Sequence, residues 1–513
     1  MFDAERLLSH VRAWIERCRP LFHGPAIRVG FTDRERTLGV LVEGYDGHGG
    51  EPGRDGLFPI ASVSKSFTAA LLLQEVEAER LDLDDPVSTF LPWFRPASPY
   101  PPITLHHLLT HTSGLAVGQE ATGEAIHELL QLAAQEPGFT PGERFGYSNA
   151  GYKALGLVLE AVTGRPWWEL TRERILGPLA MDATEPIMTN DVRPRLMTGH
   201  VPLFDDRPWR SEHGLAPAPW FESATADGTI CSTAEDMCAY LRMLLAGGGE
   251  VLSAESYALM TSPHAVEVEG GSTYGYGLST WTEEGRPLVG HSGTLHGFSS
   301  FVLFDPAAGF GAVVLSNGAC TLATRRGLLT FALDCQRAAA AGLELPPLPP
   351  PTLLDTVRDA PVYAGDYRSE DGVPRFRAEG DRLLVGSGGE MAPVERLSDD
   401  AFVAPQPELA RFALAFEREG GAVTAVAHGP RGSPARARRP RSLPSQTRRG
   451  GSSLATSAGS ACGLRTSGCS SVAGVFGCTT RSSRPTTSSC RSGRSGSVSA
   501  PRPGGPAGSS STR

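Results

Sequence analysis

Ser62 and Lys65, in the stretch SVSKSFTAALLL (residues 62–73), are the pair of residues with the clearest chemical potential in this sequence. Lys65 is one of only two lysines, because the chain otherwise uses arginine for permanent positive charge. Arginine stays protonated, whereas a buried lysine can lose its proton and act as a base. Residues three apart share a helix face, so the pair predicts a lysine-activated serine nucleophile. The alternative is a capping serine beside an exposed lysine.

The segment after Ser62 predicts a buried helix that has this serine at its N-terminus. From Phe67 onward it is apolar nearly all round, which is typical of a helix in the centre of a fold. Burial disfavours the charged form of a lysine, so Lys65 could accept the Ser62 proton. The free N–H groups at a helix N-terminus would also stabilise an oxyanion on an acylated serine.

Tyr147 and Asn149 lie two residues apart in PGERFGYSNAGY, at a predicted junction between a loop and a helix. A phenol and an amide at that position can project into one cavity. Tyr147 can serve as a second base, and Asn149 can position Lys65 and bind a substrate carbonyl. The alternative is that Ser148 or Asn149 is an ordinary helix cap.

A third motif, GHSGTLHGFSS (residues 290–300), is placed at the start of an apolar strand. Gly293 would let a substrate backbone approach closely. The N–H of Thr294 would then be a second oxyanion donor beside that of Ser62.

The elements that must position these residues follow from the apolar pattern. Helices are predicted over 3–18, 63–79, 105–112, 149–163, 233–246 (opened by a capping box from Ser232 to Glu235) and 321–340. Strands are predicted within 26–45, 273–281, 297–305 and 310–318. Strands at both ends with helices between them indicate an α+β fold, in which an antiparallel sheet is flanked by helices and a helical subdomain is inserted. The site would lie in the crevice between sheet and subdomain.

The three motifs, in this order, resemble the serine β-lactamase-like or penicillin-binding family over residues 10–340. That family includes class C β-lactamases, D-alanyl-D-alanine carboxypeptidases, D-aminopeptidases and related esterases. The resemblance implies that Ser62 accepts the acyl group and that Lys65 and Tyr147 share proton transfer. It implies that Asn149 positions the substrate. Together with Asn149, the predicted substrate-binding residues are His291, Ser292, Gly293 and Thr294, and neither a metal nor a cofactor is expected.

His291 departs from the family pattern, because many members have lysine there to attract a substrate carboxylate. Histidine is only partly charged near neutral pH, so anionic β-lactams should bind more weakly. We therefore expect a serine hydrolase that forms an acyl-enzyme on Ser62 and cleaves small esters or amides, including D-amino-acid peptides. The alternatives are a β-lactamase or D-alanyl-D-alanine carboxypeptidase, and a penicillin-binding sensor without turnover or a silent binding module.

Other polar residues have plainer explanations. His107 and His111 have the spacing of metal ligands on a helix, but Leu108 replaces the glutamate of H-E-x-x-H, so helix packing is expected. His296 is expected in a solvated loop, with a place in the pocket as the alternative. The aspartates 82, 84 and 85 are expected to be turn residues before Pro86. Five scattered cysteines in residues 1–430 are expected to be buried thiols.

The composition limits the classes of partner that the protein is expected to bind. The net charge is −9, and the 14 arginines of residues 431–513 leave about −23 for residues 1–430. An acidic body argues against nucleic acid and anionic membranes, so a small-molecule substrate is expected; the oligomeric state is left open. The N-terminus MFDAERLLSH lacks the charge pattern of a signal peptide, and no apolar stretch approaches a membrane span, which predicts a cytoplasmic location.

The chain is predicted to contain four parts. Residues 1–342 form the hydrolase domain, 343–359 a proline-rich linker, and 360–430 a small, barrel-like antiparallel β domain. The Arg/Ser/Gly-rich tail, 431–513, is predicted to be disordered. Its alternatives are an arginine-rich nucleic-acid arm and an out-of-frame reading of GC-rich DNA.

Overall fold

The computed structural model describes residues 4–45, 56–119, 122–132, 134–204, 206–268, 271–349, 355–368, 374–386, 391–429 and 436–438. Residues 1–442 form one compact unit. In the described ranges, no helix is both long and apolar enough to cross a bilayer.

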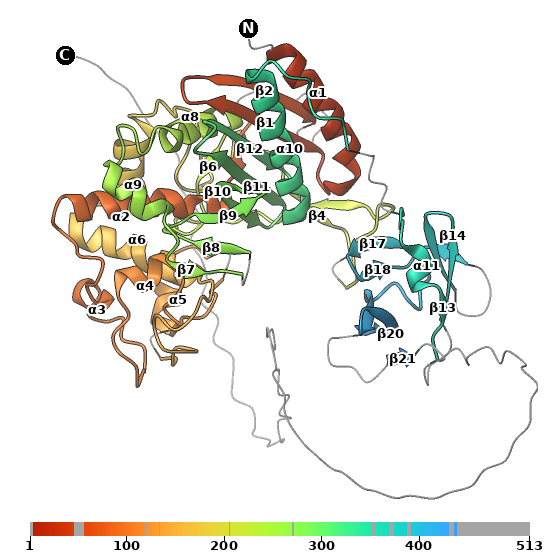
Figure 1. Cartoon of the computed structure of the whole chain (residues 1–513). Helices are drawn as coiled ribbons and strands as arrows, with labels where there is room; N and C mark the ends of the chain where they lie inside the picture. The colour runs from red at the N-terminus through yellow and green to blue at the C-terminus, as the bar shows by residue number, and fades with distance from the viewer. Residues whose placement is uncertain are drawn as a thin grey trace, which may run out of the picture. The chain divides into compact units, whose positions relative to one another are not determined.

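A sheet of eight antiparallel strands forms the framework of the larger part of this unit (Figure 1). Its order is β2-β1-β12-β11-β10-β9-β8-β7, so β1 from the N-terminal end pairs with β12 from a segment nearly 300 residues later. The strands are β1 (Ala26–Asp33), β2 (Thr37–Gly44), β7 (Ala265–Val266), β8 (Ser272–Tyr274), β9 (Ser279–Glu283), β10 (Arg286–Leu295), β11 (Phe298–Asp305) and β12 (Phe310–Ser316). The predicted α+β fold, with one sheet built from both ends of the region, is confirmed.

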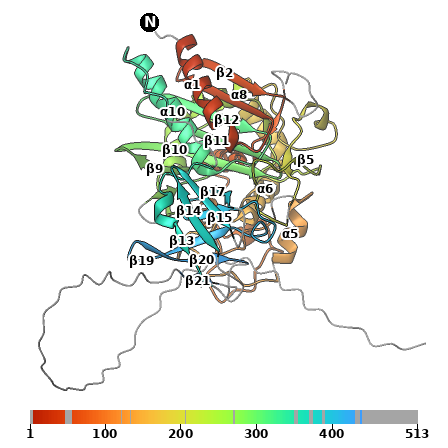
Figure 2. The same ribbon diagram turned by 90° about the vertical axis from the view of Figure 1, so that its right-hand side faces the viewer.

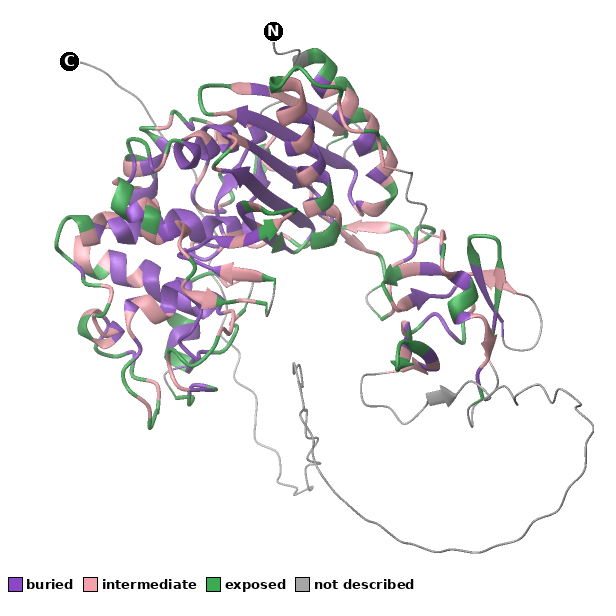
Figure 3. Ribbon diagram, viewed as in Figure 1, coloured by how far each residue is buried: buried purple, intermediate pink, exposed green. Residues whose placement is uncertain are grey.

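Helices cover both faces of this sheet (Figure 2). On one face α1 (Ala4–Cys18) and α10 (Leu322–Ala340) pack against each other, and α8 (Ala234–Leu245) packs on the opposite face. Alternate residues of β11 therefore enter different cores: Phe301 lies in the core under α1 and α10, and Val302 in the core on the α8 side. Burial on both faces explains why these strands are continuous apolar runs in the sequence (Figure 3).

The helices that complete the site come mainly from the chain between β2 and β7. They are α2 (Ser64–Glu77), α3 (Val87–Phe90), α4 (Leu105–Leu109), α5 (Ala125–Leu132), α6 (Asn149–Thr163), α7 (Trp167–Thr171) and α9 (Ala254–Thr261). Two short strand pairs join them: β3 (Phe58–Pro59) with β6 (Cys231–Ser232), and β4 (His200–Pro202) with β5 (Leu215–Pro217). Every residue from Ser64 to Leu73 is buried, because α2 packs against α6, α7 and α9. The predicted central helix is confirmed.

Three local predictions were wrong. The helix predicted over 105–112 ends at Leu109, because His111 has a positive φ of 58° that a helix cannot contain. The helix after β6 is capped by Thr233, whose side chain accepts from the N–H of Asp236 at 3.1 Å, and not by the predicted box from Ser232 to Glu235. The strand predicted over 273–281 is divided into β8 and β9, which are connected through Gly277 (φ 73°).

The residues after the predicted linker form two antiparallel sheets around one aromatic core that includes Tyr363, Phe376 and Phe416. The elements are α11 (Ala360–Tyr363), β13 (Gly365–Asp366), β14 (Arg375–Glu379), β15 (Arg382–Gly386), β16 (Ala392–Pro393), β17 (Glu395–Ser398), β18 (Ala401–Val403), β19 (Leu414–Glu419), β20 (Ala422–His428) and β21 (Arg436–Arg438). The domain boundaries at 342, 359 and 430 stay predictions. The predicted tail lies outside the described residues, apart from β21.

Candidate active site

Ser62 lies in a tight turn that immediately precedes α2. The turn is a single 3₁₀ turn, Ala61–Val63, and Ala61 has a positive φ of 49°. A non-glycine residue in this conformation stores backbone strain of the kind found at functional sites. Unlike its buried neighbours Val63 and Ser64, Ser62 is partly exposed. The turn thus presents the Ser62 hydroxyl at the N-terminal end of a buried helix.

Lys65 is completely buried one turn further along, and its amine contacts oxygen atoms of Ser62, Asn149 and Asp227. Lys65 Nζ lies 3.1 Å from Ser62 Oγ, 2.7 Å from Asn149 Oδ1 and 2.8 Å from the backbone oxygen of Asp227. A hydroxyl, an amide and a backbone carbonyl are neutral acceptors. The amine is therefore within proton-transfer distance of the hydroxyl in a site screened from water.

Asn149 is the first residue of α6, and the preceding loop fixes its position. The side chain of Ser148 caps α6 by accepting from the N–H of Gly151 at 3.1 Å. The N–H of Asn149 donates to the carbonyl of Val117 at 2.6 Å. The cap predicted as an alternative to a chemical role is therefore present at Ser148, and it places Asn149 against Lys65.

Tyr147 precedes this cap and lies beside Lys65. Its ring centroid is 5.1 Å from Lys65 Nζ and 4.2 Å from the ring centroid of His111. The phenol is partly exposed and lines the same cavity as Ser62 and Asn149. The structure thus brings together the first two motifs.

His111 supports this arrangement, a role that sequence reasoning missed. It is fully buried, and its Nδ1 accepts a hydrogen bond from the N–H of Ser148 at 3.0 Å. Burial, reinforced by the positive charge of Lys65, holds the pKa of His111 well below its ordinary value. The ring is therefore a neutral acceptor that fixes the Tyr147–Asn149 segment. The only signal in the sequence was its place in THTSG, after α4.

The third motif lies near the C-terminal end of β10, and not at the start of a strand as predicted. The pairing of β10 with β9 stops at Gly290, opposite Ser279. The following residues stay paired with β11 on the other side, so their second edge faces the cavity that Ser292 and Thr294 line. An open strand edge offers backbone N–H groups to a substrate.

Gly293 lies close to the backbone that precedes Ser62, and its predicted role in the approach of a substrate backbone stays a prediction. A Cβ at this position would lie 2.2 Å from the carbonyl oxygen of Ile60 and 2.3 Å from Ser300 Oγ. The close approach that requires glycine is therefore between β10 and the turn that carries Ser62, within the protein itself. Gly293 sets the spacing between the two halves of the site.

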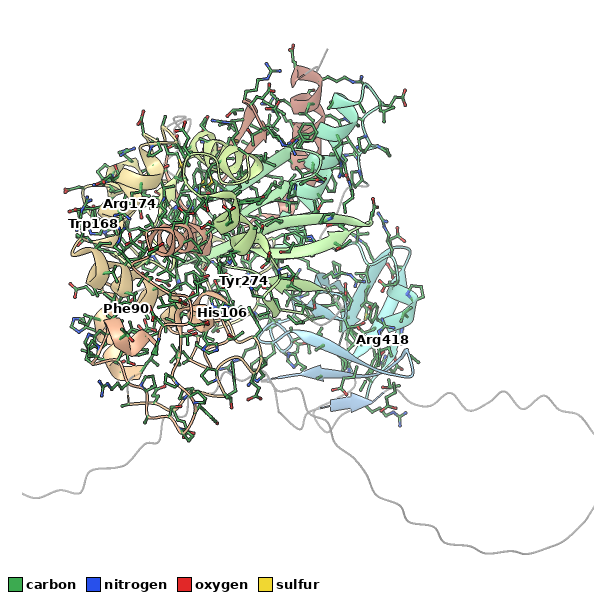
Figure 4. The ribbon with its side chains drawn as sticks, turned by 60° about the vertical axis from the view of Figure 1, so that its left-hand side comes forward. Phe90, His106, Trp168, Arg174, Tyr274 and Arg418 are labelled. Atoms are coloured by element: carbon green, nitrogen blue, oxygen red, sulfur yellow. The ribbon has the colours of Figure 1, made fainter. Side chains whose placement is uncertain are left out.

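His291 is buried and neutral, which corrects the expectation of a partly charged ring. Its Nδ1 lies 2.7 Å from the backbone oxygen of Ser292 and therefore donates to it, and its Nε2 accepts from the hydroxyl of Tyr274 at 2.9 Å. Burial, with Lys65 nearby, lowers the pKa of His291 to about 3. Tyr274, which the sequence analysis did not select, lies on β8 beside the helices of the middle segment (Figure 4).

These residues surround a cavity of about 410 Å³. Of the predicted site residues, the lining includes Ser62, Tyr147, Asn149, His291, Ser292 and Thr294. Lys65 lies behind Ser62, and Gly293 faces Ile60. The lining also contains two carboxyl groups that the sequence analysis missed, Asp227 and Glu267. Burial raises the pKa of Asp227, while the charges of Lys65 and Lys153 oppose that rise.

The remaining candidates lie elsewhere or have structural roles. His107 Nδ1 accepts from the N–H of Thr104 at 3.1 Å, so this ring caps α4 and does not share a site with His111. Within the described ranges, no cluster of three potential metal ligands occurs. His296 lines a separate cavity of about 660 Å³. Asp82 and Asp85 accept backbone N–H groups of their own turn, as predicted.

Comparisons with known proteins agree with this geometry. The family model described as Beta-lactamase matches residues 25–334. The chain is 29% identical to penicillin-binding protein 4 of Amycolatopsis lactamdurans, over 73% of this chain and 97% of that protein. It is 29% identical to a D-aminopeptidase of Cereibacter sphaeroides, over 75% and 77% of the two chains.

Among solved structures, the octameric penicillin-binding protein homologue from Pyrococcus abyssi has the same fold. It superposes with a TM-score of 0.60 at 24% identity, and the match covers 85% of this chain and 99% of that one. The family match includes all three motifs, and in sequence these motifs lie between β1 and β12 of the sheet. The chain belongs to the β-lactamase family and is a serine hydrolase.

Proposed function

We propose that this hydrolase works through an acyl-enzyme on Ser62 and cleaves small esters or amides. The observation that carries the proposal is the 3.1 Å contact between Lys65 Nζ and Ser62 Oγ, made in a buried pocket that opens on the cavity. A buried amine that is hydrogen-bonded to a hydroxyl, an amide and a backbone carbonyl is suited to take up a proton from that hydroxyl.

In the first step, Ser62 Oγ transfers its proton to Lys65 Nζ and forms a bond to the substrate carbonyl carbon. The carbonyl electron pair moves to oxygen, and the backbone N–H groups of Ser62 and Thr294 hold this oxyanion. Collapse of the intermediate breaks the bond to the leaving group, which takes a proton by way of Tyr147. A water molecule then releases the acid and regenerates Ser62.

The charges at the cavity favour the binding of neutral or cationic substrates over that of anionic substrates. At the position of His291, many members of the family have a lysine. The pKa of His291 is about 3, which keeps its ring neutral. A substrate carboxylate would also meet the carboxyl groups of Asp227 and Glu267. This favours esters, amides and D-amino-acid peptides, in keeping with the D-aminopeptidase relative, over β-lactams and carboxypeptidase substrates.

The proposal is tested by incubating the protein separately with a fluorophosphonate and with a penicillin. Intact mass and peptide mapping then locate any adduct. We expect a fluorophosphonate adduct on Ser62 that the Ser62→Ala variant loses. Ser64→Ala is the matched control, since Ser64 is a buried hydroxyl two residues away that accepts from the N–H of Ile230 at 3.3 Å. An adduct that persists in Ser62→Ala would overturn the assignment.

The penicillin sample separates the proposed function from its alternatives. A stable penicillin adduct on Ser62 would favour a carboxypeptidase or a sensor without turnover. Labelling by the fluorophosphonate alone would favour the esterase or amidase function. Repeated turnover of an ester, beyond one equivalent of product per protein, would exclude the sensor.

A further inference from the structure

Asp227 is an acidic residue at the site whose side chain the mechanism does not use. It lies in the turn before β6 and is 3% exposed, and it lines the same cavity as Ser62. Its backbone oxygen accepts from Lys65 Nζ at 2.8 Å, which fixes this turn against the catalytic residues. One carboxyl oxygen, Oδ1, has no hydrogen-bond partner among the described residues.

The Asp227 carboxyl group has a hydrogen bond with the Thr225 side chain and lies near the charges of Lys65 and Lys153, but its buried Oδ1 atom has lost water without gaining a hydrogen bond, which is costly. Such a group in a native structure needs an explanation, and a missing ligand is one. The orphaned oxygen belongs to a residue that lines the substrate cavity, so a substrate group can supply the absent donor.

The charges around the cavity select the kind of donor. Glu267, on the segment between β7 and β8, is a second carboxyl group in the lining, and the described lining residues include no lysine or arginine. The nearby His291 is neutral. Arg325 lies behind β10, buried, where it donates to the backbone oxygens of Gly293 and Ser300. The charged side chains that line the cavity are therefore acidic, and the positive charges of Lys65 and Lys153 lie near Asp227 but outside the lining.

We propose that Asp227 is a specificity residue that binds a positively charged amino group of the substrate through Oδ1, and that Glu267 strengthens this attraction. The substrate class is then an ester or amide with a free primary amine near the scissile carbonyl, such as an amino-acid amide or a peptide with a free N-terminus. This inference rests on the proposed acyl-enzyme function and narrows its substrates.

An ammonium group at this position would also assist the first chemical step. Lys65 must be neutral to accept the Ser62 proton. A substrate cation close to Lys65 disfavours a second positive charge on its amine. The recognised group would thus favour the neutral, basic form of Lys65 at the moment of attack.

The test uses two boronic acids, which bind a serine nucleophile covalently and do not depend on turnover. One is (1-aminoethyl)boronic acid, and the other is propan-2-ylboronic acid, in which an uncharged methyl group of similar size replaces the ammonium group. Their inhibition constants are measured with 4-nitrophenyl acetate, a neutral reporter ester, and both enantiomers of the amine are used. We expect the free amine to bind at least about 10-fold more tightly, as a charge-assisted hydrogen bond requires. Equal binding, tighter binding of the methyl compound or no inhibition by either would overturn the proposal.

Variants then assign the preference to a residue. Asp227→Asn keeps the shape and removes the charge, and we expect it to reduce the amine preference about 10-fold or more. Glu267→Gln should reduce it by a smaller factor. Glu250→Gln, an exposed charge between α8 and α9, is the matched control and should keep the full preference. The amine preference is the ratio of the two inhibition constants measured on the same variant, so a change in that variant's basal rate does not affect it. An unchanged ratio in Asp227→Asn would reject this residue.

Failure of the inference is distinguishable from failure of the proposed function. If the fluorophosphonate does not label Ser62 and the reporter ester is not hydrolysed, the acyl-enzyme function itself is wrong. If both occur and the amine gives no advantage, the hydrolase function stands and the role of Asp227 is wrong.

Discussion

The chain's two lysines are both completely buried, and they differ in the groups that contact their amines. Lys65 on α2 contacts a hydroxyl, an amide and a backbone carbonyl. Lys153, one turn into α6, contacts the carboxylate of Glu128 at 2.5 Å and the backbone oxygen of Gln119 at 2.6 Å. Hydrogen bonds to neutral acceptors leave an amine able to exchange a proton, whereas the direct ion pair between Lys153 and a buried carboxylate stabilises the positive charge of that lysine.

The second lysine has a structural task. Glu128 also accepts from the N–H of Gln119 at 2.8 Å, so the ion pair fixes the segment that follows Val117. Val117 lines the cavity, and its carbonyl accepts from the N–H of Asn149. Burial alone therefore does not identify a catalytic lysine. The chemistry of its acceptors does.

The largest effect expected from this comparison is on activity at Lys65. Lys65→Met removes the base, and Lys65→Arg keeps the charge but cannot release its proton. Both should lower kcat/KM for 4-nitrophenyl acetate by about 10³-fold. Lys153→Arg should keep most of the activity, because an arginine can still pair with Glu128. An active Lys65→Arg protein would remove the distinction between the two lysines.

The next effect is on stability at Lys153. Lys153→Met leaves the Glu128 carboxylate buried without its partner and should lower the free energy of unfolding by roughly 3–5 kcal/mol. Denaturant unfolding measures this. The double variant Lys153→Met/Glu128→Gln removes both charges and should recover a large part of the loss. If the single variant were as stable as the wild type, the ion pair could not be what fixes this segment.

His291 allows the effect of burial on a charged group to be tested through the pH dependence of stability. Its pKa is about 3 in the folded protein and about 6.5 in the unfolded chain. Between these two pH values the ring binds a proton in the unfolded chain but not in the folded protein. Stability from this group is therefore present above pH 6.5 and falls as the pH drops toward 3. From pH 6.5 to 4 the loss is roughly 3 kcal/mol.

The measurement is denaturant unfolding of the wild type and His291→Asn at pH 7, 5 and 4. The variant should lose less stability than the wild type over this range. Because His111 and His23 also have lowered pKa values, both proteins will still weaken at low pH. Parallel curves for the two proteins would mean that His291 is not a buried neutral ring.

Much of the fold was predictable because its signals are local. The bounds of α6 match the prediction at both ends, since Ser148 is a strong helix start signal and Gly164 a strong helix stop signal. Contacts between distant residues were not predictable in this way. The early end of α4 coincides with the positive φ of His111, a residue whose side chain accepts a hydrogen bond from the N–H of Ser148, 37 residues later. No periodic pattern in the sequence encodes such a contact.

The same division applies to the site. The approach of Lys65 to Ser62 follows from a spacing of three residues in one segment. Asp227 and Tyr274 reach the site from a turn and a short strand that carry no motif. The purpose of Gly293 was also hidden, because the Ile60 carbonyl that requires it comes from another part of the chain.

Gly293 offers the smallest predicted effect, and it tests how closely the Ser62 turn and β10 must fit. In Gly293→Ala the new Cβ would lie 2.2 Å from the carbonyl oxygen of Ile60, so β10 must shift away from the turn. A displacement of this kind should cost about 10- to 100-fold in kcat/KM for the reporter ester. Gly327→Ala in α10 is the matched control, since nothing lies within 4 Å of its Cβ, and it should keep full activity. Full activity in Gly293→Ala would mean that the N–H groups of Ser62 and Thr294 can move apart without loss of rate. The rate would then depend on Lys65 and Ser62 alone.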